Sequence, residues 1–153
     1  MFSGKKDMTA CPCEKFRSPV TTFAEVQERC RASAEIRGSL DSVATGDWFA
    51  VLRCRECGSF WAEEWPFSES HGGGPPCYYR IAATDAHEWL HTHEPFTHTL
   101  RQQSEDLAFY QSLAPEVGPE SCAHPTCSHR RIQHSVFCQR HHFEMIKRKP
   151  CPL

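Results

Sequence analysis

Residues 47–67 read DWFAVLRCRECGSFWAEEWPF, and this stretch decides the fold. Its two halves, 47–54 and 59–67, are rich in aromatic and β-branched residues, which predicts two strands. Between them, Cys54 and Cys57 are separated by two residues and followed by a glycine, so the pair occupies the turn of a hairpin. A thiolate pair on a tight turn offers two corners of a tetrahedron to one zinc ion. The stretch therefore predicts a zinc-ribbon-like hairpin.

A second close pair, Cys11 and Cys13, offers the other two corners. The alternative for Cys54 and Cys57 is a thioredoxin-like redox pair, which would lie at the start of a helix after a strand. Strand patterns flank this pair on both sides, so redox chemistry is disfavoured. Ten cysteines in a chain that begins without an apolar leader favour metal binding over the disulfide scaffold of a secreted protein. We predict one zinc site formed by Cys11, Cys13, Cys54 and Cys57.

The last thirty residues carry the most specific metal pattern. Two cysteines form a knuckle, a β segment is expected over residues 131–137, and two further ligands fall three residues apart at the start of a helix expected over 139–149. This order is that of a treble-clef-like zinc unit, and three thiolates with one imidazole form a closed, structural site. The predicted ligands are Cys122, Cys127, Cys138 and His141, with His142 as an alternative to His141.

The rest of the chain predicts an α+β fold, a small antiparallel sheet with flanking helices. Thr22 and Glu25 form a capping box for a helix that ends at Gly38. Cys30 lies on the apolar stripe of that helix and is expected in the core. The other expected elements are a third strand over 77–82, a short helix capped by Asp85 and a helix over 100–113.

Composition and charge divide the chain. A mean hydropathy of −0.56, with 11 prolines and 8 glycines, predicts a small hydrophobic core that needs further stabilisation, such as a structural metal ion. Residues 41–94 hold nine acids and three bases, whereas residues 120–153 hold six bases and two acids. We expect a zinc-stapled core domain over 1–114, a linker over 115–121 and the treble-clef-like unit over 122–153.

No stretch is long and apolar enough to span a membrane, so a soluble, cytoplasmic protein is expected.

Two motifs resemble catalytic signatures. His87, Glu88 and His91 match the H-E-x-x-H pattern of zinc metallopeptidases, in which both histidines share one helical face. The downstream histidine extension of that pattern is absent, so a solvated histidine face is favoured and the metallopeptidase is kept as an alternative. Residues 71–74 read HGGG, as in lipase oxyanion loops, but the chain has no Gly-x-Ser-x-Gly nucleophile turn. We therefore expect a protein that is not an enzyme.

One stretch resembles a known family. Residues 60–76 read FWAEEWPFSESHGGGPP and are followed by YYRI at 78–81. This run is similar to a bacterial immunity-protein family that neutralises toxins of polymorphic toxin systems, with an aromatic strand, a Pro-x-Ser-Glu-x-His-Gly-Gly-Gly-Pro-Pro loop and a short strand. The resemblance covers residues 47–81, under a quarter of the chain. It departs from the family where the Cys54–Cys57 pair replaces an Asp- and Gly-rich turn.

The resemblance implies a protein that binds and occludes a cognate toxin without catalysis. Two interpretations of the acidic middle of the chain stay open: it mimics nucleic acid toward a basic nuclease toxin, or it is an ordinary solvated face. The residues expected to contact the partner are Glu63, Glu64, Glu69 and His71.

A nucleic-acid-binding zinc-finger protein is the first alternative, because basic residues gather in the C-terminal unit. They are Arg130, Arg131, Arg140, Lys147, Arg148 and Lys149. The unit lacks the stacking aromatics of single-strand binders, and the chain has a net charge of −2. The two predicted ligand sets together predict two zinc ions per chain.

Overall fold

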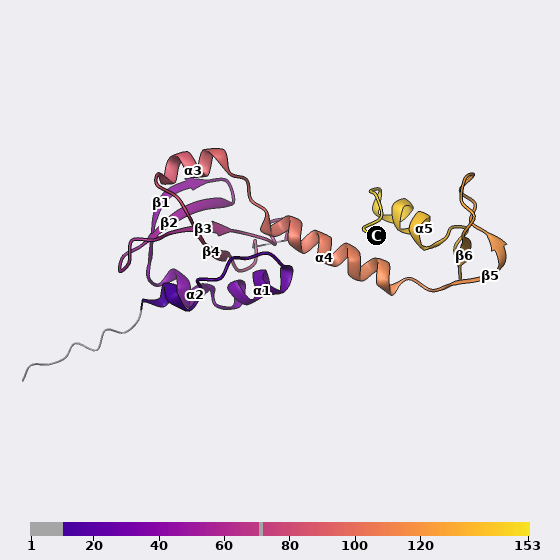
Figure 1. Ribbon diagram of the computed structural model, residues 1–153, viewed down its shortest axis with the longest axis horizontal. Coiled ribbons are helices and arrows are strands. Elements are labelled where there is room, and N and C mark those ends of the chain that lie inside the picture. The colour runs from indigo at the N-terminus through magenta and orange to yellow at the C-terminus, as the bar shows by residue number, and fades with distance from the viewer. Residues whose placement is uncertain (1–10, 71) are drawn as a thin grey trace, which may run out of the picture. The chain divides into compact units, whose positions relative to one another are not determined.

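The computed structural model describes residues 11–70 and 72–153 (Figure 1). His71, which was expected to contact a partner, lies outside the described residues. The chain divides into two compact units, one ending at Arg101 and the other running from Gln102 to Leu153. The described elements confirm the predicted α+β class, with an antiparallel sheet, helices and two cysteine-rich clusters.

The first unit is built on a four-stranded antiparallel sheet in the order β1-β2-β3-β4. Its strands are β1 (Leu40–Gly46), β2 (Phe49–Cys54), β3 (Phe60–Glu64) and β4 (Cys77–Ile81). The last three were predicted, with slightly longer bounds. β1 was not predicted, because its register with β2 shifts between Ser42 and Ala44. Such a bulge breaks the alternation of apolar and polar residues by which a strand is recognised.

Short helices flank this sheet. They are the 3₁₀ turn η1 (Pro12–Glu14), α1 (Phe23–Arg31), α2 (Ser33–Arg37), α3 (Ala86–Thr92) and the beginning of α4 (Thr97–Ser112). The capping box of Thr22 and Glu25 is present at the start of α1. The single helix expected up to Gly38 is divided in two, because Ala32 ends α1 with non-helical backbone angles. α1 and α2 contact β4, whereas α3 contacts β1 and β2.

Alternate residues of β2 enter different parts of the core. Leu52 and Cys54 pack with Trp61 and with Cys13, which follows the first residue of η1. Val51 points the other way and packs with residues of α3. Because Cys13 and Cys54 are both members of a packed core cluster, the sheet itself brings the two cysteine pairs together.

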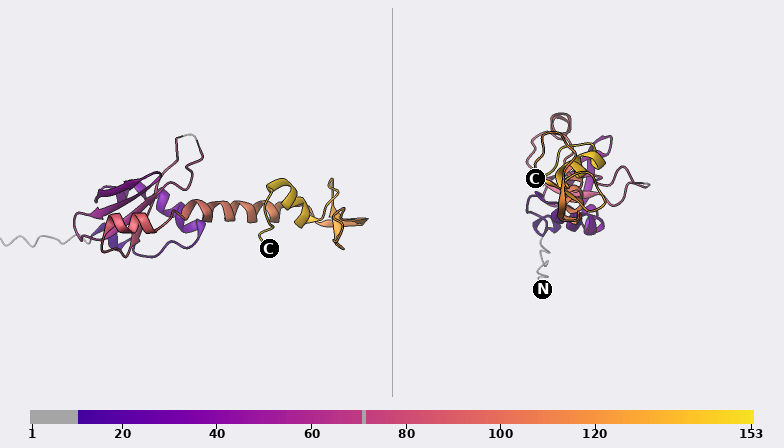
Figure 2. Two further views of the ribbon diagram at one scale, coloured as in Figure 1. Left: turned by 90° about the horizontal axis from the view of Figure 1, so that it is seen from above. Right: turned by 90° about the vertical axis from the view of Figure 1, so that its right-hand side faces the viewer.

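The loop between β3 and β4 stands out from the sheet (Figure 2). Its base is held by Arg101, whose Nε donates to the carbonyl oxygen of Pro66 at 2.8 Å. The guanidinium of Arg101 also forms an ion pair with Glu69 and lies 5.5 Å from the ring centroid of Phe67. These contacts fix the described part of the loop against the beginning of α4.

The second unit contains β5 (Glu116–Ser121), β6 (Arg130–Ile132) and α5 (Gln139–Lys147). Residues 116–121, where a linker was expected, form β5 and pair with β6 in a two-stranded sheet. Phe143 of α5 is fully buried, with the rings of Phe109 and Tyr110 at centroid distances of 5.9 Å and 6.0 Å. Over the described residues, no helix combines the length and the apolar character needed to span a membrane.

Candidate metal centres

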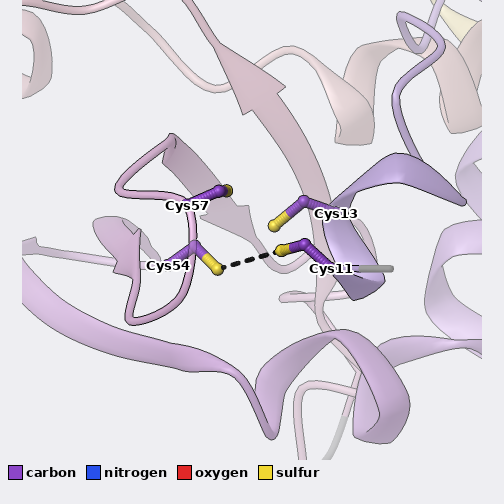
Figure 3. A group of neighbouring side chains, drawn as sticks. All are labelled: Cys11, Cys13, Cys54 and Cys57. Atoms are coloured by element: carbon purple, nitrogen blue, oxygen red, sulfur yellow. Dashed lines mark hydrogen bonds between the residues drawn. The ribbon is translucent and has the colours of Figure 1, made fainter. Parts of the chain in front are cut away.

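The first candidate metal centre joins η1 to the β2–β3 hairpin (Figure 3). The sulfur atoms of Cys11, Cys13, Cys54 and Cys57 all lie within 4.8 Å of one another. Cys11 Sγ and Cys54 Sγ are 3.6 Å apart. A tetrahedral zinc ion with bonds of about 2.3 Å to sulfur implies sulfur separations of about 3.8 Å. The four predicted ligands therefore fit one zinc ion.

Local backbone bonds present these thiols. The N–H of Gly58 donates to the carbonyl oxygen of Cys54 at 3.0 Å, and the N–H of Cys54 donates to that of Ser59 at 2.9 Å. Gly58 has a φ of 72°, in the left-handed region that glycine adopts without strain. On the other side, Pro12 begins η1 directly after Cys11 and the N–H of Glu14 closes the turn on the Cys11 carbonyl. Each cysteine pair thus lies on a closed turn.

Two side chains that the sequence analysis did not identify support this centre. Ser59 Oγ lies 3.0 Å from Cys57 Sγ and 3.6 Å from Cys13 Sγ. Trp61, which is fully buried, donates from Nε1 to Ser59 Oγ at 3.0 Å. The indole N–H occupies one acceptor position of the hydroxyl, so the hydroxyl proton is directed toward a thiolate. Outer hydrogen bonds of this kind orient metal ligands and tune their basicity.

The thiols of the first centre differ in acidity. Burial raises the pKa of Cys57, but hydrogen bonds from the hydroxyl and the N–H of Ser59, together with those from the thiols of Cys11 and Cys54, outweigh burial and lower the pKa to about 6. Burial raises the pKa of Cys13, and the hydrogen bond from Ser59 offsets only part of this. Burial also raises the pKa of Cys11. Of these three thiols, the exposed Cys57 therefore ionises most readily, whereas Cys11 and Cys13 are helped to ionise by the positive charge of a metal ion.

The second candidate metal centre lies between the β5–β6 region and α5. Its ligand atoms, also within 4.8 Å of one another, belong to Cys122, Cys127, Cys138 and His141. Cys127 Sγ and Cys138 Sγ are 3.8 Å apart, and His141 Nδ1 lies 3.3 Å from Cys138 Sγ. These separations suit a tetrahedral ion with three sulfur ligands and one nitrogen ligand. The two clusters together fit two zinc ions.

The structure distinguishes between the two adjacent histidines. His141 Nδ1 belongs to the ligand group, whereas His142 Nδ1 lies 2.8 Å from the hydroxyl of Ser135. The ring of His124 stacks on that of His141, with centroids 3.9 Å apart and an interplanar angle of 2°. His124 is exposed, and this contact helps to fix the plane of the ligand imidazole.

Backbone groups tune the thiols of the second centre. Burial opposes ionisation of Cys122, but the N–H groups of Cys138 and His124, with the neighbouring thiols, lower its pKa. Burial raises the pKa of Cys138 to about 11, despite a hydrogen bond from the N–H of His141. Cys138 is the N-cap residue of α5, and the start of a helix favours a negative charge.

Two further cysteines form a buried pair outside both centres. Cys30 is buried, which agrees with its expected place in the core, and Cys77 is fully buried beside it. A hydrogen bond between the two thiols raises the pKa of Cys77, together with burial, and lowers that of Cys30. Cys151, which belongs to neither centre, is half-buried near the side chain of Tyr110.

The H-E-x-x-H residues lie on α3 and are exposed. In the described part of the chain, His, Cys and carboxylate ligand atoms gather in groups of three or more only at the two centres above. His87 and His91 belong to neither group, so the described residues supply no third ligand to them. Asp85 caps the helix by accepting from the N–H of Glu88 at 2.7 Å.

The acids expected on a partner-binding surface have different environments. Glu69 is exposed and pairs with Arg101, and Glu63 is half-buried and accepts from the hydroxyl of Tyr78. Glu64 is only 1% exposed and is covered by the start of α4. Glu64 was expected to contact a partner, and that role stays a prediction; its carboxylate lies in hydrogen bonds within the protein and not on the exposed acidic surface.

Comparison with protein-family models, with curated proteins and with solved structures finds no match for this chain. The fold and the centres define its class as an α+β protein with two clusters that fit zinc.

Proposed function

We propose that this protein is a non-enzymatic immunity protein, held together by zinc, that binds and neutralises a cognate toxin. The resemblance of residues 60–81 to an immunity family supports the proposal. The observation that carries it is the construction of the β3–β4 loop, where the resemblance is densest. A protein that acts by occlusion needs a surface whose shape exists before the partner arrives, since a preformed surface loses little entropy on binding.

The loop has the contacts that such a surface requires. Trp48, in the turn between β1 and β2, is 54% exposed and lies over Gly73. A Cβ atom on Gly73 would be only 2.8 Å from Trp48 Cζ3, so the indole rests directly on the loop backbone. Arg101 fixes the loop at Pro66. The loop is thus held at two separate places, and an aromatic ring is exposed beside it.

The metal centres support a structural role for zinc. Each cluster provides four protein ligands, and a closed set of four leaves no position for a substrate or a reactive water. Zinc held in this way contributes to folding, and many small metal-binding units unfold without it. The proposed activity therefore lies in the metal-free surface of the first unit.

Nucleic-acid binding is less well supported, because most cations of the C-terminal unit have an acidic partner. Lys147 and Lys149 both pair with Asp106. Arg140 pairs with Glu144 at 3.2 Å, and Arg131 pairs with Glu120. Paired cations release fewer counterions from a phosphate backbone. Retention on DNA or heparin that falls steeply with salt would favour this alternative.

A growth assay tests the proposal. The protein encoded beside this gene is expressed alone and together with this chain. We expect the neighbour to stop growth alone and this chain to restore it, with a complex recovered by gel filtration. Trp48→Ala should abolish rescue, whereas Val43→Ala, at a 39% exposed position of β1, should retain it. Failure of the wild type to restore growth or to bind the toxic neighbour would overturn the proposal.

A further inference from the structure

A pocket of about 310 Å³ lies beside the exposed turn of Trp48. Two of its lining residues are Trp48 and Trp65, whose ring centroids are 5.9 Å apart at an interplanar angle of 75°. Glu64 and Glu69 bring two carboxylates to the lining, and His98 adds an imidazole. The pocket thus combines two perpendicular aromatic rings with carboxylates.

Glu64 is an unusual member of this lining, because it is a buried carboxylate that has no cationic partner among the described residues. It accepts from the hydroxyl of Tyr79 at 2.5 Å, from the N–H of Phe96 at 3.1 Å, and from the N–H and Oγ1 of Thr97 at 2.7 Å and 2.5 Å. Burial and the proximity of Glu64 raise the pKa of Tyr79, so the phenol remains a donor. None of the ion pairs among the described residues includes Glu64. Within the described part of the chain, the groups that hydrogen-bond to this carboxylate are neutral donors, and burial leaves its attraction for a cation little screened by water.

The backbone of Trp48 is strained. Gly46 pairs with Phe49, so Asp47 and Trp48 form a two-residue hairpin turn. Trp48 has a φ of 56°, in the left-handed region that favours glycine or asparagine. The chain therefore keeps a large, exposed aromatic ring at a position where a small residue would be more comfortable. Such strain is typical of functional sites.

We infer that this pocket receives a cationic side chain, arginine or lysine, from the partner protein. The cation would lie against the faces of Trp48 and Trp65, where cation–π attraction is strongest for tryptophan, with Glu64 behind it. The chain already contains one such arrangement, in which the guanidinium of Arg101 lies over Phe67 and pairs with Glu69. A phosphate group would instead meet the carboxylate of Glu64, which favours a basic protein over nucleic acid.

The inference rests on the proposed function in one respect: it assumes that the cationic side chain belongs to a partner protein. It can be tested without a partner, using N-acetyl-arginine amide as the probe and N-acetyl-citrulline amide as its neutral isostere. Titration is followed by the indole N–H signals of Trp48 and Trp65 in NMR spectra. We expect saturable shifts with a dissociation constant in the millimolar range for the arginine compound. The citrulline compound should bind at least about ten-fold more weakly, because it lacks the charge.

Two substitutions at one position separate binding from stability. Trp48→Ala and Trp48→Gly both remove the ring, but glycine also relieves the left-handed backbone. We expect both variants to lose the arginine-induced shifts of Trp65, while Trp48→Gly is the more stable of the two. Equal shifts with arginine and citrulline compounds, no shift with either, or unchanged arginine binding in both variants would overturn the inference.

The two proposals can fail separately. If the toxic neighbour is neutralised but the arginine compound does not bind, the pocket inference is wrong and the immunity proposal stands. If the arginine compound binds as described but the chain neither binds nor neutralises the neighbour, the immunity proposal is wrong and the pocket remains a cation site.

Discussion

Replacement of Gly73 by alanine tests whether Trp48 and the β3–β4 loop form one surface. Gly72 provides a matched control, because both glycines have left-handed backbones, with φ of 86° and 72°. Each alanine therefore meets the same backbone penalty, about 1–2 kcal/mol. A Cβ on Gly72 would have no heavy atom within 4 Å, whereas one on Gly73 would lie 2.8 Å and 3.2 Å from two ring atoms of Trp48.

The difference between the two variants measures the contact of Trp48 with the loop. Those ring atoms are the far end of a half-exposed side chain, so the indole should turn aside and the loop should stay folded. That movement weakens the edge-to-face pair with Trp65, which is worth about 0.5–1.5 kcal/mol. Gly73→Ala should therefore be less stable than Gly72→Ala by about that amount. It should also change the tryptophan fluorescence, which Gly72→Ala should leave unchanged.

The assay is urea unfolding at saturating zinc with a reductant present, followed by fluorescence and by circular dichroism. Repeating both glycine variants in a Trp48→Ala background completes a double-mutant cycle, in which the excess cost of Gly73→Ala should disappear. If the two glycine variants are equally stable in the protein that retains Trp48, and neither changes the fluorescence, the contact on which the proposed surface depends is refuted.

Four further predictions concern the metal centres. Elemental analysis should give two zinc ions per chain, and Cys13→Ser and Cys138→Ser should each remove one. After chelation under reducing conditions at pH 7, iodoacetamide should modify Cys57 before Cys13. Cys57 is exposed and has a pKa of about 6, whereas Cys13 is buried and its pKa is raised. Peptide mass spectrometry that shows the reverse order of modification would contradict this prediction. Ser59→Ala should weaken zinc binding at the first centre by about ten-fold or more in a chelator competition, while the exposed Ser42→Ala should not. His141→Ala should release the C-terminal zinc, whereas His142→Ala should retain both ions and lose about 1 kcal/mol with its bond to Ser135.

The ligand sets were predictable because their members are close in sequence. Cys54 and Cys57 are separated by one turn, and Cys138 and His141 by one turn of helix, so local geometry alone brings each pair together. Cys11 and Cys13 are distant in sequence from the hairpin. Their pairing with Cys54 and Cys57 was inferred because each cysteine pair supplies only two of the four ligands that a zinc ion needs. The sequence could not distinguish His141 from His142, because the choice depends on the hydroxyl of Ser135 on a separate segment.

The elements that were missed have irregular local patterns. β1 contains a register shift, which hides its alternation, and β5 includes a proline and a glycine, which are typical of a linker. β5 pairs with β6 through Glu116 and Ile132 and through Ser121 and Arg130, with an irregularity between. Pairing across the chain, which no local pattern encodes, gives both segments their structure.

Glu64 shows why the surface was harder to predict than the metal. Two adjacent acids at the end of a strand are expected at the surface, because burying a carboxylate is costly unless donors surround it. Here the donors come from Tyr79, fifteen residues away, and from Thr97, thirty-three residues away. Their convergence follows from the register of β3 with β4 and from the place where α4 begins. Glu64, which the sequence assigns to a docking surface, therefore accepts hydrogen bonds from the first residue of α4. It also lines the pocket in which we propose the partner is bound.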